Sequence, residues 1–209
     1  METEILSILL NIGFNLQDAE TISQNIITTY NKSDRGYHDL THISNMLYYL
    51  NDFITNSGTT RKITDINEFK FAIIMHDYVN GTKNDIESSI TKVKQFLHKI
   101  SANCCYAYIE KLIRATDYEN PTQTDFEQQL MQDLDLLILG SDIAEYDAYV
   151  AKIRTQYNEY PDTIFNSNRI KILNIFLNRL HIYNLAYFRD KYEEKARNNL
   201  KQEIQRLSN

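Results

Sequence analysis

Residues 35–54 read "RGYHDLTHISNMLYYLNDFI", and their apolar side chains recur every three or four residues. Ile43, Leu47, Leu50 and Ile54 therefore share one side of a helix with about 3.6 residues per turn. The same period continues along the chain, and the alternation typical of β-strands is nowhere sustained. Five glycines and two prolines leave few points at which helices would break. The sequence thus predicts an all-α protein.

The length and composition predict one domain. The chain has 209 residues, of which 43% are hydrophobic and 24% charged, enough for a substantial apolar core. We expect a single helical bundle over residues 1–209, built from about nine helices. Helix starts are predicted at Asn15, Asn84 and Thr124, each followed three residues later by an acid. Loops are predicted at residues 57–61, 80–83, 119–124 and 160–168.

The charge of the chain restricts its partners. The formal net charge is −6, and lysine and arginine form no block. A broad surface for a nucleic-acid polymer or an anionic membrane is therefore not expected. No run approaches the roughly 18 apolar residues that span a bilayer. The N-terminal segment "METEILSILLNIGF" carries acids where a secretory signal needs basic residues, so we expect a cytoplasmic protein.

Residues 184–209 form a charged C-terminal segment. Within it, "YEEKARNNLKQEIQRL" places acids and bases three and four residues apart, as on a solvated helix face. We expect this helix to pack either on the rest of the domain or along a partner helix. The second possibility would give a homodimer.

Two segments carry histidines with metal-binding potential. His38 and His42 are four residues apart, a spacing that places two side chains on one helical face. In "FAIIMHDYVNGTKND", residues 71–85, His76 and Asp77 end an apolar stretch. An ionised carboxylate buried there without a partner is costly, and a divalent cation supplies one while also binding a neutral imidazole. Taken singly, each of these residues is more often an ordinary core or boundary residue.

A third segment, "QQLMQDLDLLILG" at residues 128–140, places two acids in strongly apolar surroundings. Asp133 and Asp135 are each either a residue on the helix surface or a ligand that projects into the centre of the domain. The segment by itself leaves both possibilities open.

The order of these residues resembles that of the HD superfamily of metal-dependent phosphohydrolases, an all-α fold whose ligands are a His, a His-Asp doublet and a distal Asp. The similarity to small stand-alone bacterial HD proteins extends over most of the chain, through "YHDLTHI", "HDY", "LIRAT", "DLDLLILG", "YDAYVAKIRTQY" and "NRIKILNIFLNRLHIY". By this resemblance the metal ligands are His42, His76, Asp77 and Asp135, with Asp135 preferred to Asp133.

The resemblance also implies one divalent metal ion, Mn²⁺, Fe²⁺, Co²⁺ or Mg²⁺. Members with two metals use further histidines between the doublet and the distal Asp, where this chain has only His98. Two histidines and two carboxylates leave positions on an octahedral metal for water and for a phosphate oxygen.

A second resemblance concerns "YHD", residues 37–39. It is similar to the "YHN" of cyclic-nucleotide phosphodiesterases, in which a metal-binding His follows four residues later. By that resemblance His38 is the proton donor, and His38 and Asp77 are the predicted catalytic residues. Asp39 stands where the pattern has Asn, and a carboxylate there is expected to fix the tautomer of His38.

Four further residues are candidates for substrate binding. Lys83 and Asn84 follow the doublet, where HD proteins place residues that position substrate or water. Arg154 and Arg169 match basic positions of the family, and a guanidinium offers a planar fork suited to two phosphate oxygens. The alternative for each of these side chains is a surface salt bridge.

The resemblance therefore implies hydrolysis of a small phosphorylated metabolite, in the first place a nucleotide, by a metal-bound water that attacks phosphorus. Monoesters, diesters and pyrophosphates are all cleaved on this fold, and the fold does not choose among them. One alternative is an HD-fold protein that binds a nucleotide without turnover, as a sensor or interaction protein. Another is a helical scaffold that dimerises through its C-terminal helix.

Overall fold

In the computed structural model, helix α3 (Leu40–Asn56) carries the predicted apolar face into the core. Three of the four predicted positions on it are buried, whereas Ile54, in the last turn, is 48% exposed. Phe53 is buried instead, because its ring stacks on Phe188 of the C-terminal helix, with 5.4 Å between the ring centroids. The end of α3 is thus turned towards the C-terminal part of the chain.

The structure describes residues 1–81, 84–100, 104–119 and 124–208. These residues contain ten α-helices, a short 3₁₀ helix called η1 and no strand, which confirms the all-α prediction of about nine helices. The remaining elements in chain order are α1 (Glu2–Asn11), α2 (Leu16–Tyr30), α4 (Ile66–Met75), α5 (Asp85–Leu97), α6 (Tyr106–Arg114), α7 (Phe126–Asp135), η1 (Leu136–Gly140), α8 (Ile143–Gln156), α9 (Asp162–Leu177) and α10 (Ala186–Leu207).

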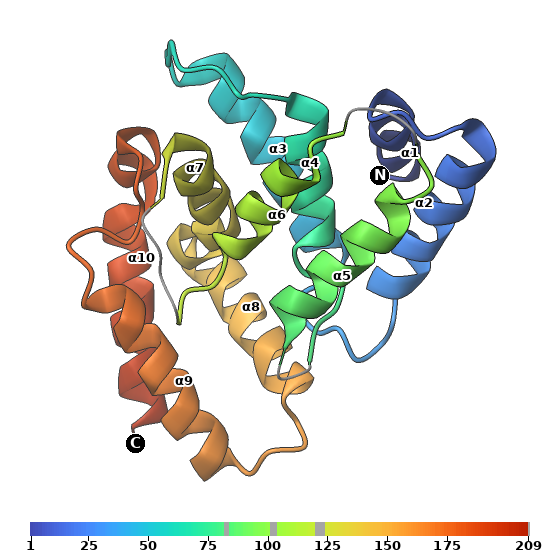
Figure 1. Ribbon diagram of the computed structural model, residues 1–209. Helices are drawn as coiled ribbons and strands as arrows, with labels where there is room; N and C mark the ends of the chain where they lie inside the picture. The colour runs from blue at the N-terminus through green and yellow to red at the C-terminus, as the bar shows by residue number, and fades with distance from the viewer. Residues whose placement is uncertain (82–83, 101–103, 120–123, 209) are drawn as a thin grey trace.

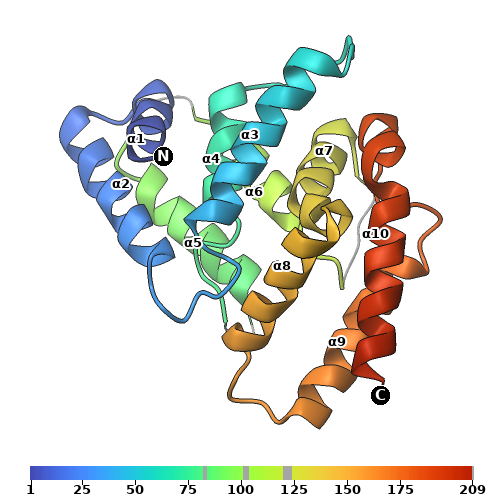
Figure 2. The same cartoon turned by 180° about the vertical axis from the view of Figure 1, so that it is seen from behind.

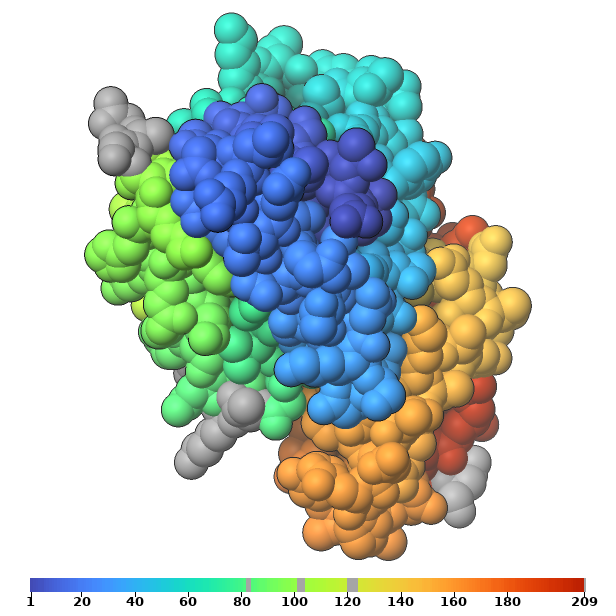
Figure 3. All heavy atoms as spheres, turned by 90° about the vertical axis from the view of Figure 1, so that its right-hand side faces the viewer, coloured from blue at the N-terminus to red at the C-terminus, as the bar shows by residue number. Residues whose placement is uncertain are grey.

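The helices form one bundle with the middle of the chain at its centre. In Figures 1 and 2, α1 and α2 lie at one end of the molecule and α9 and α10 lie side by side at the other. Helices α3, α4, α7 and α8 occupy the space between these pairs. Figure 3 shows the end that α1 and α2 cover. The central helices are therefore the ones whose termini can meet inside the protein.

The predicted helix starts agree with the structure to within one residue. The side chain of Asn15 accepts a hydrogen bond from the N–H of Asp18 and begins α2, as predicted. Asn84 directly precedes α5. The third start is displaced from Thr124 to Asp125, because Asp125 and Gln128 form a reciprocal capping box.

The loop predicted at residues 160–168 is wrong over most of its length. Pro161 precedes α9, which begins at Asp162 and runs through the predicted loop. Burial of Phe165 and Arg169 favours the helix, since both side chains lie on its inner face. The loop at residues 57–61 is confirmed. Those at 80–83 and 119–124 include residues 82–83 and 120–123, which lie outside the described residues.

The C-terminal helix α10 packs on its own chain. It contacts η1 and α9, and it buries Ala196, Asn199, Leu200 and Glu203. The approach to η1 is so close that a Cβ atom on Gly140 would lie 2.7 Å from the Cβ atom of Tyr192. Of the two expected packing modes, the structure thus shows the one within the domain.

No helix in the described part of the chain is both long enough and apolar enough to cross a membrane. The longest one, α10, mixes acidic and basic residues along its whole length.

Candidate metal centre

Three central helices bring four predicted ligands together. His42 lies in the first turn of α3, His76 and Asp77 follow the end of α4, and Asp135 is the last residue of α7. His42 Nε2 lies 3.4 Å from His76 Nε2 and 3.2 Å from Asp135 Oδ1. His76 Nε2 lies 3.0 Å from Asp77 Oδ2 and 3.5 Å from Asp135 Oδ1. Side chains from three segments that are far apart in the sequence thus meet at one place.

The spacing of these atoms suits a metal ion. The fifth distance, from His42 Nε2 to Asp77 Oδ2, is 3.7 Å, so all five lie between 3.0 and 3.7 Å. Neighbouring ligands about 2.1 Å from one octahedral ion are about 3.0 Å apart, and tetrahedral ones about 3.4 Å. His42, His76 and Asp77 could therefore hold a metal ion. Asp135 Oδ1 lies next to this group, within 3.5 Å of both imidazole Nε2 atoms.

The second ring nitrogen, Nδ1, of each imidazole also has a hydrogen-bond partner. His76 Nδ1 donates to the carbonyl oxygen of Ile73 at 2.8 Å, which leaves the Nε2 lone pair of the neutral ring facing the carboxylates. His42 Nδ1 lies 3.0 Å from the hydroxyl of Tyr37. Metal-binding histidines are commonly oriented by such a bond at their second nitrogen. The ring orientation therefore fits coordination through Nε2.

The electrostatics of the cluster favour a positive charge at its centre. Burial raises the pKa of the Asp135 carboxyl, but His42 and His76 hold it well below its usual range. Burial likewise lowers the pKa of the His76 imidazole, but Asp77 and Asp135 raise it well above its ordinary value. Both rings are only 2% exposed. A bound cation would thus neutralise the same carboxylates that a protonated histidine neutralises in its absence.

The geometry distinguishes the two acids of α7, Asp133 and Asp135, as candidates for the fourth ligand. Asp135 Oδ2 also accepts a hydrogen bond of 2.8 Å from the hydroxyl of Tyr118. Asp133 instead faces α10, where it accepts hydrogen bonds from the N–H groups of Asn184 (2.7 Å) and Leu185 (2.8 Å). Burial raises the pKa of Asp133 to about 7, although these bonds lower it in part. Asp133 therefore anchors the start of α10 and lies outside the cluster.

His38 lies at the edge of the cluster, with its Nε2 atom 4.0 Å from Asp77 Oδ2. It stands in the turn before α3, so the expected helical spacing of His38 and His42 is not realised. Its Nδ1 atom is 2.8 Å from Oε1 of Gln156, the last residue of α8. The amide of Gln156 in turn donates to Asn80 Oδ1 at 2.8 Å. Gln156 therefore fixes Nδ1 as the protonated nitrogen of a neutral His38.

The expected role of Asp39 is consequently wrong. Its carboxylate accepts hydrogen bonds from the N–H groups of Thr41 and His42 and pairs with Lys152 at 2.9 Å, so it begins α3 and does not orient His38. Sequence spacing could not have found Gln156, because it is 118 residues from His38.

The predicted phosphate-binding residues are placed differently from one another. Arg154 pairs with Asp162 and bonds to the carbonyl oxygens of Tyr157 and Tyr160, so its guanidinium is directed at the turn after α8. Asn84 lies beside a separate surface hollow next to α5. Lys83 lies outside the described residues.

Arg169 is buried and reaches the wall of a cleft next to the cluster, but its guanidinium is already bound. Its Nε lies 2.8 Å from Glu203 Oε1, and one terminal nitrogen lies 3.1 Å from the hydroxyl of Tyr149. Arg169 thus contributes to a buried ion pair between α9 and α10.

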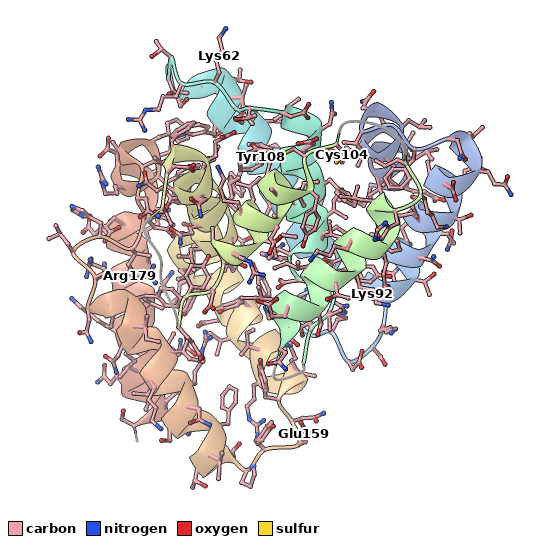
Figure 4. All side chains as sticks on the ribbon, in the orientation of Figure 1. Lys62, Lys92, Cys104, Tyr108, Glu159 and Arg179 are labelled. Atoms are coloured by element: carbon pink, nitrogen blue, oxygen red, sulfur yellow. The ribbon has the colours of Figure 1, made fainter. Side chains whose placement is uncertain are left out.

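The cleft lies between α8 and α9 and has a volume of about 430 Å³. His38 and, of the four residues of the cluster, Asp135 line this cleft, so the cluster lies next to it. Figure 4 marks the two ends of α9, with Glu159 in the turn before the helix and Arg179 after it. A cleft of this size can hold a small molecule whose reacting group faces the cluster.

The comparisons with known proteins add no assignment. No protein-family model, no curated protein and no solved structure matches this chain. What the chain can do therefore has to be argued from the arrangement of its own residues.

Proposed function

We propose that this protein is a metal-dependent phosphohydrolase that acts on a small phosphate ester. The observation that carries the proposal is that the Nε2 atoms of His42 and His76 lie 3.4 Å apart, each within 3.0 to 3.7 Å of one oxygen of Asp77 and one of Asp135, beside a cleft that Asp135 lines. His42, His76, Asp77 and Asp135 would hold one divalent ion, as the order of these residues in HD proteins suggests. Mn²⁺, Fe²⁺, Co²⁺ and Mg²⁺ are the candidates for this mixed nitrogen and oxygen set.

A divalent ion bound there would supply Lewis acidity towards water and a phosphate oxygen. The remaining steps belong to the side chains. His38 faces the cluster through Nε2, the nitrogen that Gln156 does not engage, so in the imidazolium form Nε2 is the atom that can give a proton to a leaving oxygen. Asp77, 4.0 Å away, stabilises that proton before transfer.

The HD resemblance supports a nucleotide as the substrate and leaves the ester type to experiment. The test panel therefore contains nucleoside mono-, di- and triphosphates, cyclic nucleotides, and simple aryl and alkyl phosphates. A binding protein without turnover would bind a member of this panel and release no phosphate with any of the four metals.

The experiment compares the wild-type protein with the His76→Ala/Asp77→Ala double variant, both purified without chelator. Elemental analysis is expected to give about one transition metal per wild-type chain and none in the variant. Phosphate release from the panel should follow the metal. His98→Ala is the matched control, because His98 is exposed and is not among the side chains of the cluster.

The opposite outcome would be wild-type protein that binds none of Mn²⁺, Fe²⁺, Co²⁺ or Mg²⁺ and hydrolyses no ester. In that case the four side chains would be a buried network of hydrogen bonds and charges, and the proposed activity would be rejected.

A further inference from the structure

The cleft between α8 and α9 differs in chemistry from the cluster beside it. Its walls are formed mainly by aromatic and aliphatic side chains, with Tyr149, Ile153 and Tyr157 on or just after α8 and Phe165 and Ile172 on α9. Such walls bind a partner by contact area and by the faces of aromatic rings. The cleft is thus suited to a flat or compact apolar group.

Of the six uncharged polar side chains that line the cleft, three are engaged within the protein through their hydroxyl groups. The hydroxyl of Tyr37 lies against His42, that of Tyr118 donates to Asp135, and that of Tyr149 lies against Arg169. Sugar hydroxyls and the edges of a nucleobase need unengaged donors and acceptors, because a buried polar group without a partner costs binding energy. These three hydroxyls would have to break existing bonds to serve a nucleoside.

The charge of the cleft also limits its ligand. Apart from His38, Arg169 is the one side chain lining it, among the described residues, that can carry positive charge. Both oxygens of Glu203 lie within 3.2 Å of that guanidinium, so the positive charge is compensated. A second phosphate in the cleft would therefore be buried without a counter-charge, which is unfavourable.

From these three observations we infer that the substrate is a phosphate monoester whose leaving group is an uncharged apolar or aryl alcohol, seated between α8 and α9. This inference rests on the proposed phosphohydrolase function, and it replaces the nucleotide that the HD resemblance suggests with an ester that has an apolar leaving group. Water attacks phosphorus and releases one proton to solvent, the ester P–O bond breaks, and the leaving oxygen takes a proton from the imidazolium form of His38, which solvent then reprotonates. The products are inorganic phosphate and the free alcohol, with no change in oxidation state.

Two isoleucines on α9 provide a matched pair for the test. Ile172 is 39% exposed and lines the cleft, whereas Ile164 is 49% exposed and is not part of its lining. Replacement of either by Gln changes the same chemistry on the same helix. Because neither side chain is fully buried, both variants are expected to fold.

The first measurement is kcat/KM of the Mn²⁺-loaded protein for 1-naphthyl phosphate, phenyl phosphate and AMP. We expect naphthyl phosphate to exceed phenyl phosphate and AMP by about tenfold, because its second ring is buried on binding. Ile172→Gln should lower the naphthyl value by about fivefold, and Ile164→Gln should leave it unchanged.

The second measurement is binding of 1-naphthol in the presence of EDTA, followed by naphthol fluorescence. It reports occupation of the cleft without metal or turnover. If no ester is hydrolysed but naphthol binds to the wild type and not to Ile172→Gln, the phosphohydrolase proposal fails and the apolar cleft stands. If AMP is hydrolysed faster than naphthyl phosphate, or Ile164→Gln is as damaging as Ile172→Gln, the assignment of the cleft to an apolar leaving group is overturned.

Discussion

Gln156 holds His38 through a 2.8 Å contact between Oε1 and Nδ1, although the two residues lie 118 positions apart in the chain. The contact joins the end of α8 to the turn before α3 and directs Nε2 of His38 towards Asp77. A side chain outside the predicted ligand set thus determines which nitrogen of His38 faces the cluster.

Replacement of Gln156 by Leu should therefore affect turnover more than binding. Loss of one hydrogen bond to the acting imidazole is expected to lower kcat about tenfold and to change KM by less than about twofold. Steady-state kinetics and metal content are the measurements. Thr155→Ala, one exposed position earlier, is the control. Equal losses in both variants, or loss of bound metal in Gln156→Leu, would contradict a positioning role.

Substitutions of the two acids of α7 should affect different properties, metal binding for Asp135 and stability for Asp133. Asp135→Asn removes a carboxylate from the cluster and is expected to weaken metal binding by at least about a hundredfold. Asp133→Asn leaves the cluster intact but replaces an acceptor of two backbone N–H groups, so it should lower the free energy of unfolding by about 1–3 kcal/mol. Metal titration and urea denaturation of both variants test the assignment. Reversed effects would place Asp133 in the metal site.

Gly36 should be essential to the position of His38. It has φ +58°, and a Cβ atom there would lie 2.6 Å from the Cβ atom of Gln156. Gly58 has a similar φ of +65°, with open space around it. Both Gly→Ala variants are expected to lose about 1 kcal/mol of stability to backbone strain, but only Gly36→Ala adds a steric clash. Gly36→Ala should therefore show the larger loss of thermal stability and, unlike Gly58→Ala, a loss of kcat.

Asp39→Asn tests the revised role of Asp39. Asn also caps helices well, so kcat should stay within about twofold of wild type. Burial raises the pKa of Asp39, but Lys152 and the N–H groups of α3 lower it further, to below its ordinary value. A lowered native pKa means that the ionised form stabilises the fold above about pH 4.

The stability difference between wild type and Asp39→Asn should consequently be present at neutral pH and disappear as the pH falls through this range. Its size should be under about 1 kcal/mol, because the pair with Lys152 is partly exposed. Chemical denaturation at pH 7 and pH 3 measures both values. A large loss of kcat in this variant would restore the carboxylate as a partner of His38.

Local patterns predicted the helical class and the region of the site, because helix period and capping depend on neighbours in the sequence. Leu47 and Leu50 are buried as the period requires, and Asn15 caps a helix as expected. His42 and His76, 34 positions apart, are also brought together, but here the order of residues in a known family supplied the expectation.

Tertiary partners could not be predicted in the same way. The burial of Arg169 depends on Glu203, a residue on another helix. It also depends on the start of α9 at Asp162, which the sequence did not predict because the segment around Pro161 has the pattern of a loop. Likewise, Asp133 and Asp135 are equivalent in local composition, and only the direction of each side chain distinguishes the residue of the candidate metal centre from the residue that anchors α10.

The buried pair of Arg169 and Glu203 has a further consequence for the cleft. Glu203 also accepts from the hydroxyl of Tyr146 on α8, so the pair connects α8, α9 and α10. Loss of one partner would leave an uncompensated buried charge, at a cost of about 3–5 kcal/mol. The spacing between the walls is thus set before any ligand arrives. A ligand entering the cleft loses little affinity to ordering of the protein, and selectivity depends on the fit of a rigid shape.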